Sequence, residues 1–125
     1  METQIDYISE AKRYIANAKE ILKEKAKKHD GNYTDPKYIK MAGHTAYAGV
    51  LVALDGAFGK KGKGRKDVDW YKERIAGKNK KLIYPFLNVY EIMHLCMGYD
   101  GVVSYKMANF GFEEAEKIIT AFSGS

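Results

Sequence analysis

Residues 41–55 read MAGHTAYAGVLVALD, and this stretch decides the fold. Small side chains let a second backbone come close, which suits a helix at the centre of a bundle. Each glycine inside a helix costs roughly 1 kcal/mol relative to alanine, so close packing must offset both. We therefore expect the most buried helix of the chain here. Its small residues lie on adjoining faces: Ala42, Gly43, Ala46, Gly49, Ala53 and, beyond the quoted stretch, Ala57.

Start signals bound this central helix. Thr34 and Asp35 supply capping side chains, and Pro36 follows at a position where its missing N–H costs nothing. The sequence predicts a helix from Pro36 to about Phe58.

The other helices follow from apolar residues spaced three and four apart. No segment alternates with period two. The pattern predicts an all-α fold, a four-helix up-and-down-type bundle with one or two additional short helices, in a single domain 1–125. The expected ranges are Thr3–Lys28, a short helix from Asp67 to Gly77, Pro85–Met97, a short piece 102–108, and Phe112–Phe122.

Composition restricts the class of protein. The chain has 125 residues, of which 46% are hydrophobic and 30% charged, as in a globular protein. No apolar run approaches the roughly 20 residues of a membrane-spanning helix, and the Met1 end is polar, unlike a signal peptide. Cys96 is the single cysteine, so no internal disulfide is possible. We expect no membrane association and a cytoplasmic location.

Positive charge gathers in residues 59–81. This region holds ten basic and three acidic residues, so it carries +7, whereas the whole chain carries +5. A basic region of this kind indicates contact with phosphates or an acidic partner, or a solubilising surface loop. Tryptophan beside tyrosine could add a stacking platform for nucleic acid. The candidate phosphate- or nucleic-acid-binding residues are Lys60, Lys61, Lys63, Arg65, Lys66, Trp70 and Tyr71.

The histidines offer weak candidates for chemistry. Their spacing predicts no metal site, and Cys96 lies two residues from His94, so the two point to different faces of a helix. We interpret Cys96 as a small buried residue. A pocket formed by His44, Tyr47 and His94 is conceivable, and an enzyme would need the two histidines to meet there. Each histidine is otherwise interpreted as partly buried and hydrogen-bonded.

Three segments resemble HEPN domains. Residues 41–55 resemble the second helix of that family, and the first helix, with Ala11, Tyr14, Ala18 and Leu22, is similar to its opening helix. Residues 99–119 resemble its turn and final acidic helix. A closer likeness is to a small group of uncharacterised bacterial helical-bundle proteins distantly related to HEPN domains. The resemblance implies a bundle, frequent homodimers, and a link to nucleotides, RNA or a partner protein.

The nuclease motif of that family is missing. Its ribonuclease members carry an arginine followed after four to six residues by a histidine, and no histidine follows Arg13, Arg65 or Arg74 at that spacing. No catalytic residue is carried over, and no cofactor is expected. We predict a non-catalytic protein-interaction or dimerisation module, in which the second and fourth helices offer surplus apolar surface. The alternative is nucleic-acid or nucleotide-phosphate binding through residues 59–81.

Overall fold

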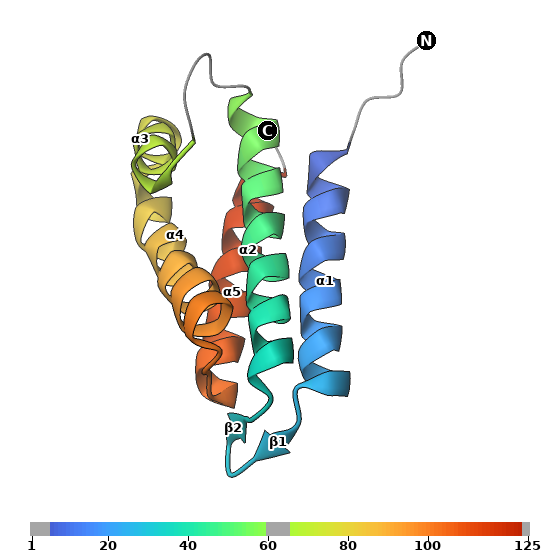
Figure 1. Ribbon diagram of the computed structural model, residues 1–125. Coiled ribbons are helices and arrows are strands. Elements are labelled where there is room, and N and C mark those ends of the chain that lie inside the picture. Colours follow the sequence, from blue (N-terminus) through green and yellow to red (C-terminus); the bar gives the residue numbers. More distant parts are fainter. Residues whose placement is uncertain (1–5, 60–65, 124–125) are drawn as a thin grey trace.

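Four helical rods stand side by side and alternate in direction in the computed structural model, which describes residues 6–59 and 66–123 (Figure 1). The predicted all-α bundle with an additional short helix is confirmed. The rods are α1 (Tyr7–Lys25), α2 (Pro36–Phe58), α4 (Ile83–Val89) continued by η2 (Tyr90–Asp100), and α5 (Tyr105–Ala121).

The first rod begins and ends inside its expected limits. Asp6 caps α1 by accepting a hydrogen bond from the Ser9 N–H at 3.0 Å, so the helix starts at Tyr7. Thr3, where the expected range begins, lies outside the described residues. After α1, strands β1 (Lys28–His29) and β2 (Asn32–Tyr33) form a small antiparallel hairpin that the sequence pattern did not predict. Asp30 and Gly31 turn it with positive φ angles of 50° and 80°.

Helix α2 has the predicted bounds and lies at the centre of the fold. It packs most extensively against α1 and η2. A Cβ atom on Gly49 would stand 2.7 Å from the Cβ of Tyr14, and one on Gly43 would stand 2.5 Å from the Met93 carbonyl oxygen. The two glycines therefore allow close approach of α1 on one side and of η2 on the other, as the small residues predicted.

The second half of the chain departs from the expected bounds. Helix α3 (Val68–Lys78) is capped by Asp67 and is followed by a 3₁₀ turn, η1 (Lys80–Leu82). Helix α4 then starts before Pro85, because a proline in the first turn has no intrahelical acceptor to lose. The rod continues past Met97, wound as a π-helix in which N–H groups donate five residues back.

The last rod is one helix where two were expected. Ser104 caps α5 by accepting a hydrogen bond from the Met107 N–H at 3.1 Å, so the short piece at 102–108 and the final helix join. Near its middle, Glu114 is buried and accepts a 2.8 Å hydrogen bond from the Asn88 amide of α4. Over the ranges described, no helix is both long and apolar enough to cross a membrane.

Candidate functional site

Helix α2 has an outer face that the other rods, over the described residues, cover only in part (Figure 1). Side chains at spacings of four and three residues form one line along it, the seam pattern of two paired helices. We call this line the outer seam: Lys37, Met41, His44, Ala48, Leu51 and Asp55. Met41 is 45% exposed, although it is apolar. Each of the other five is exposed or half-buried.

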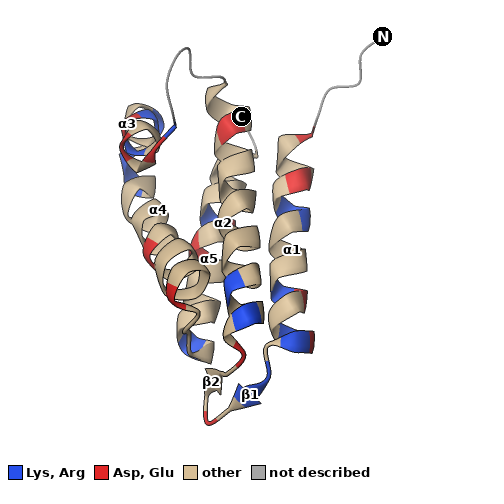
Figure 2. Cartoon of the chain, in the orientation of Figure 1, with Lys and Arg blue, Asp and Glu red and all other residues tan. Residues whose placement is uncertain are grey.

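The outer seam carries charge only at its two ends. No charged residue occurs in α2 between Lys40 and Asp55. Figure 2 shows this as an uncharged middle between basic residues near the start of α2 and an acidic residue near its end. An uncharged helix face of this length is typical of an interface, because charged side chains are depleted where surfaces become buried.

Aromatic rings border the seam on the η2 side. The ring centres of Tyr47 and His94 lie 4.9 Å apart, those of Tyr90 and His94 5.1 Å, and those of His44 and His94 6.3 Å. The structure therefore brings together His44, Tyr47 and His94, the three residues of the conceivable pocket. Burial, with a smaller effect of nearby Tyr90, raises the pKa of Tyr47 to about 12.

The two histidines differ in their surroundings. His44 is exposed and lies over Gly98, where a Cβ would meet the imidazole at 3.1 Å. His94 is half-buried, and its Nδ1 atom is buried without a hydrogen-bond partner in the part of the chain that is described. Both histidines were expected to be partly buried and hydrogen-bonded. This is wrong for His44 because it is exposed, and wrong for His94 because its Nδ1 atom has no hydrogen-bond partner among the described residues.

Cys96 lies two residues after His94 and is half-buried, whereas the sequence predicted a buried side chain. Burial is the main cause that raises the pKa of the Cys96 thiol, followed by the charges of Glu91 and Asp100, and a raised pKa disfavours the reactive thiolate. Within residues 6–59 and 66–123, no group of three or more His, Cys, Asp or Glu side chains is placed to hold a metal ion.

A hollow borders the seam on the α1 side. Its volume is about 470 Å³, and Thr45 of α2 and Ile21 of α1 contribute to its wall. Polar α1 residues complete the lining: Asn17, Glu20, Glu24 and Lys25. The outer seam therefore has a hollow on its α1 side and aromatic rings on its η2 side. The side chains of a second helix can pack into a surface of this shape.

The basic region is arranged differently from the expectation. Lys66 donates to the Asp55 carboxylate at 3.0 Å, and the Tyr71 hydroxyl donates to the same oxygen at 2.8 Å. Trp70 and Tyr71 are 8% and 4% exposed, because the Trp70 ring packs against Phe58 of α2 and the Tyr71 ring against Phe86 of α4. The expected stacking platform is therefore not presented to solvent. The remaining candidates, Lys60, Lys61, Lys63 and Arg65, lie outside the described residues.

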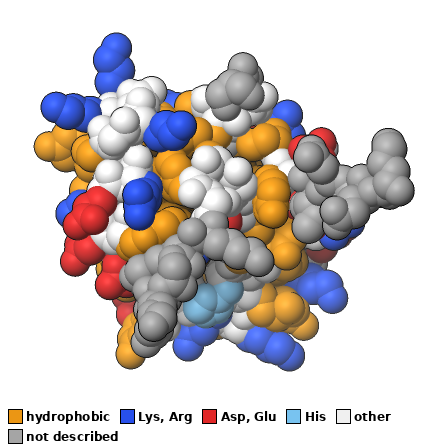
Figure 3. All heavy atoms as spheres, turned by 90° about the horizontal axis from the view of Figure 1, so that it is seen from above, with side chains coloured by type: hydrophobic (Ala, Val, Ile, Leu, Met, Phe, Trp, Pro, Cys, Tyr) orange, Lys and Arg blue, Asp and Glu red, His pale blue; other side chains and the backbone are white. Residues whose placement is uncertain are grey.

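Two hollows lie at this end of the bundle, which we call the upper end. They measure about 350 and 230 Å³ and share Ala57 and Lys78. Phe58 and Arg74 line the first, and Asn79 lines the second. Figure 3 shows the upper end from above, with basic side chains around hydrophobic patches. Neither hollow was predicted, because the residues lining each come from segments far apart in the sequence.

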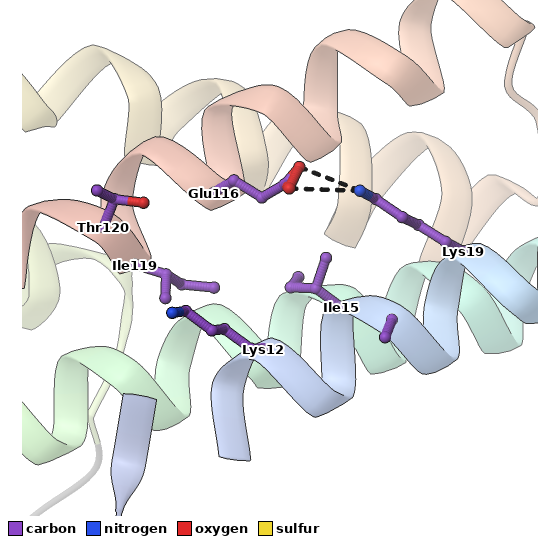
Figure 4. Close-up of a pocket in the computed structure, with 7 residues that line it drawn as sticks. Lys12, Ile15, Lys19, Glu116, Ile119 and Thr120 are labelled. Atoms are coloured by element: carbon purple, nitrogen blue, oxygen red, sulfur yellow. Dashed lines mark hydrogen bonds and ion pairs between the residues drawn. The ribbon is translucent and has the colours of Figure 1, made fainter. Parts of the chain in front are cut away.

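A further groove of about 270 Å³ runs between α1 and α5 (Figure 4). Ile15 and Ile119 line it, and both are buried. Lys19 crosses it to reach both oxygens of Glu116, at 3.1 and 3.3 Å. This ion pair joins α1 to α5, and it pairs Lys19 and Glu116 with each other.

The fold and these surfaces define an all-α helical bundle with a partly covered apolar helix face. Residues 6–123 match the family described as Domain of unknown function (DUF5618), and the chain belongs to that family. It is similar to the solved structure of a protein of unknown function from Dyadobacter fermentans, with 56% identity, a TM-score of 0.93 and 94% of each chain covered. No curated protein matches the chain.

Proposed function

We propose that this chain is a non-catalytic, cytoplasmic module that binds another protein surface through the outer seam and forms homodimers. The observation that carries the proposal is the outer face of α2, which has no charged residue between Lys40 and Asp55 and is only partly covered by the other described rods. Burying this face removes apolar surface from water at little cost in charge desolvation. The resemblance to HEPN domains, among which homodimers are frequent, agrees with this function.

Two matched methionines make the proposal testable. Met41 lies on the outer seam and is 45% exposed, whereas Met107 lies on α5 and is 42% exposed. We expect the wild-type chain to be a dimer by light scattering coupled to size exclusion. Met41→Glu should give a monomer, because it buries a charge at the interface. Met107→Glu should leave the dimer unchanged.

The outcomes separate the seam from other surfaces. Circular dichroism must show equal helicity for both variants, which is expected because both side chains are exposed. A wild-type chain that stays monomeric at high concentration and recovers no partner from a cell extract would refute the proposal. A dimer that survives Met41→Glu and is lost in Met107→Glu would move the interface to α5.

A second candidate function is binding of a nucleic acid or a nucleotide phosphate at the upper end. It is favoured by the hollow whose lining includes Phe58 and the two cations Arg74 and Lys78, together with one acidic residue, Glu73. A ring and two cations are the groups that bind a base and its phosphate. The +7 charge of residues 59–81 favours the same ligand class.

Fluorescence anisotropy with short single-stranded and duplex RNA tests this candidate. Five phosphate contacts predict a log–log salt slope of about −3.5 on single strands, and about −4.5 on a duplex if the coefficient for B-DNA applies. Arg74→Gln combined with Lys78→Gln should weaken binding, and Lys106→Gln on α5 is the control. No binding at about 50 mM salt would remove this candidate.

A further inference from the structure

The outer seam is self-complementary when one copy of the chain is turned end for end. We infer that two copies pair through antiparallel α2 helices about a two-fold axis that passes at the level of Ala46. In this register three kinds of layer form: Lys37 faces Asp55, Met41 faces Leu51, and His44 faces Ala48 of the second copy. This inference rests on the proposed function and adds the partner and the alignment.

The first argument for this register is the spacing of the seam residues. Lys37, His44 and Leu51 are seven residues apart, and so are Met41, Ala48 and Asp55, so the two sets are the two core positions of a heptad pattern. In antiparallel pairs, each core position of one type faces the other type. Every layer proposed here joins one member of each set, so a single register satisfies all six positions.

The second argument, for antiparallel rather than parallel pairing, is the charge at the two ends of the seam. The Lys37 ammonium is exposed, and its nitrogen lies 5.3 Å from the centre of the Tyr38 ring. Asp55 receives Lys66 and Tyr71 on the same oxygen, Oδ1, and remains half-exposed. Antiparallel pairing brings each lysine to the acidic end of the other helix. Parallel pairing would place Lys37 against Lys37 and Asp55 against Asp55.

The third argument for the antiparallel register is the size of the side chains that face each other. The large His44 imidazole faces the small Ala48, and a large and a small side chain fill one layer without a void or a clash. In a parallel pair the two imidazoles would face each other, while two alanines would leave a gap. Two middle-sized side chains, Met41 and Leu51, meet in the layer between these and the charged ends.

Cysteine cross-linking tests the alignment. We would prepare two chains, Met41→Cys and Leu51→Cys, each also carrying Cys96→Ser, with a size tag on one. In the inferred register, the thiol introduced at position 41 of one chain faces the thiol introduced at position 51 of the other. Their Cα atoms then lie within the roughly 4.4–6.8 Å that a disulfide spans. Two copies of residue 41 are about 15 Å apart along the helix axis.

Mild oxidation of the mixture should therefore give a disulfide-linked heterodimer, and either chain alone should give little. Cross-linking of each chain to itself would overturn the alignment in favour of a parallel one. A wild-type dimer that yields no cross-link in any combination would also overturn it, while the proposed function stands. A monomeric wild-type chain would refute both. Reduction must return the unlinked, helical protein in every case.

Discussion

The inner and outer faces of α2 use the same kinds of residue in two environments. The inner face, with Ala46, Val50 and Leu54, is fully buried against α1, η2 and α5. The outer face, with Ala48, Leu51 and Val52, is covered only halfway by its neighbours. Both faces are apolar, so composition alone does not tell a core from an interface. The comparison teaches that the second face needs a partner that the single chain does not supply.

The largest difference between the faces should be in the free energy of unfolding lost when a leucine is replaced, and two leucines three residues apart allow the comparison. Leu54→Ala removes a fully buried side chain and should lower the free energy of unfolding by about 3 kcal/mol. Leu51→Ala, on the half-covered outer face, should lower it by less than about 1 kcal/mol in the dilute monomer. Urea denaturation at low protein concentration measures both. Equal losses would mean that the outer face is part of the core.

Gly43→Ala tests how tightly the inner face is packed. The added Cβ would stand 2.5 Å from the Met93 carbonyl oxygen and 2.6 Å from the Gly98 nitrogen, and backbone atoms cannot move away cheaply. The clash should outweigh the helix-propensity gain, for a net loss of about 1–2 kcal/mol in thermal or urea unfolding. Gly77→Ala in α3 is the control. It meets nothing within 4 Å and should be stabilising.

Lys37→Glu tests the charged end of the outer face. The change places a glutamate opposite Asp55 at both ends of the proposed pair, so the dimer dissociation constant should rise about fivefold at low salt. The increase should shrink as salt screens the exposed charges. Sedimentation over a concentration series measures it, with Lys106→Glu on α5 as control. An unchanged constant at low salt would contradict the antiparallel alignment.

The smallest expected effect comes from Tyr47, at the border between the two faces. Replacing it should change the stability of the fold only at alkaline pH. Its pKa is about 12 in the folded chain and 10.0 in the unfolded chain, so the fold binds the phenol proton more tightly. The resulting stability is complete below pH 10 and is lost as the pH rises toward 12. Tyr47→Phe should flatten the fall in melting temperature over that window. An unchanged slope would mean that this phenol is not responsible.

The sequence was informative where local chemistry acts alone. Pro36 and the small residues placed α2 at the centre with its observed bounds, although the expected side-chain cap is wrong: Asp35 makes no capping hydrogen bond and the Thr34 hydroxyl donates to the Lys27 carbonyl. The Asp30-Gly31 pair is a known hairpin signal that would have revealed β1 and β2. The joining of α5 depends on the Ser104 cap, which the start signals of other helices could have suggested.

Long-range packing decided what the sequence left open. The π-helical winding of η2 brings Met93 and Gly98 against Gly43, a contact between segments some fifty residues apart. Lys66, just before the start of α3, and Tyr71, within α3, both donate to Asp55 of α2. The predicted grouping of His44, Tyr47 and His94 was found, but the line of six residues on α2 became visible only when the inner face was known.

The packing around Trp70 gives the protein an optical label. Trp70 is the single tryptophan of the chain, and two cations lie over its ring: the Lys66 ammonium at 5.3 Å and the Arg74 guanidinium at 5.2 Å from the ring centre. Its indole emission should therefore change when an anion draws either cation away, and also when a second copy approaches Asp55 at the end of the outer seam, because Lys66 binds that carboxylate. The same emission would therefore report two events in separate experiments: RNA binding at the upper end in a titration at fixed protein concentration, and dissociation of a dimer in a dilution series without RNA.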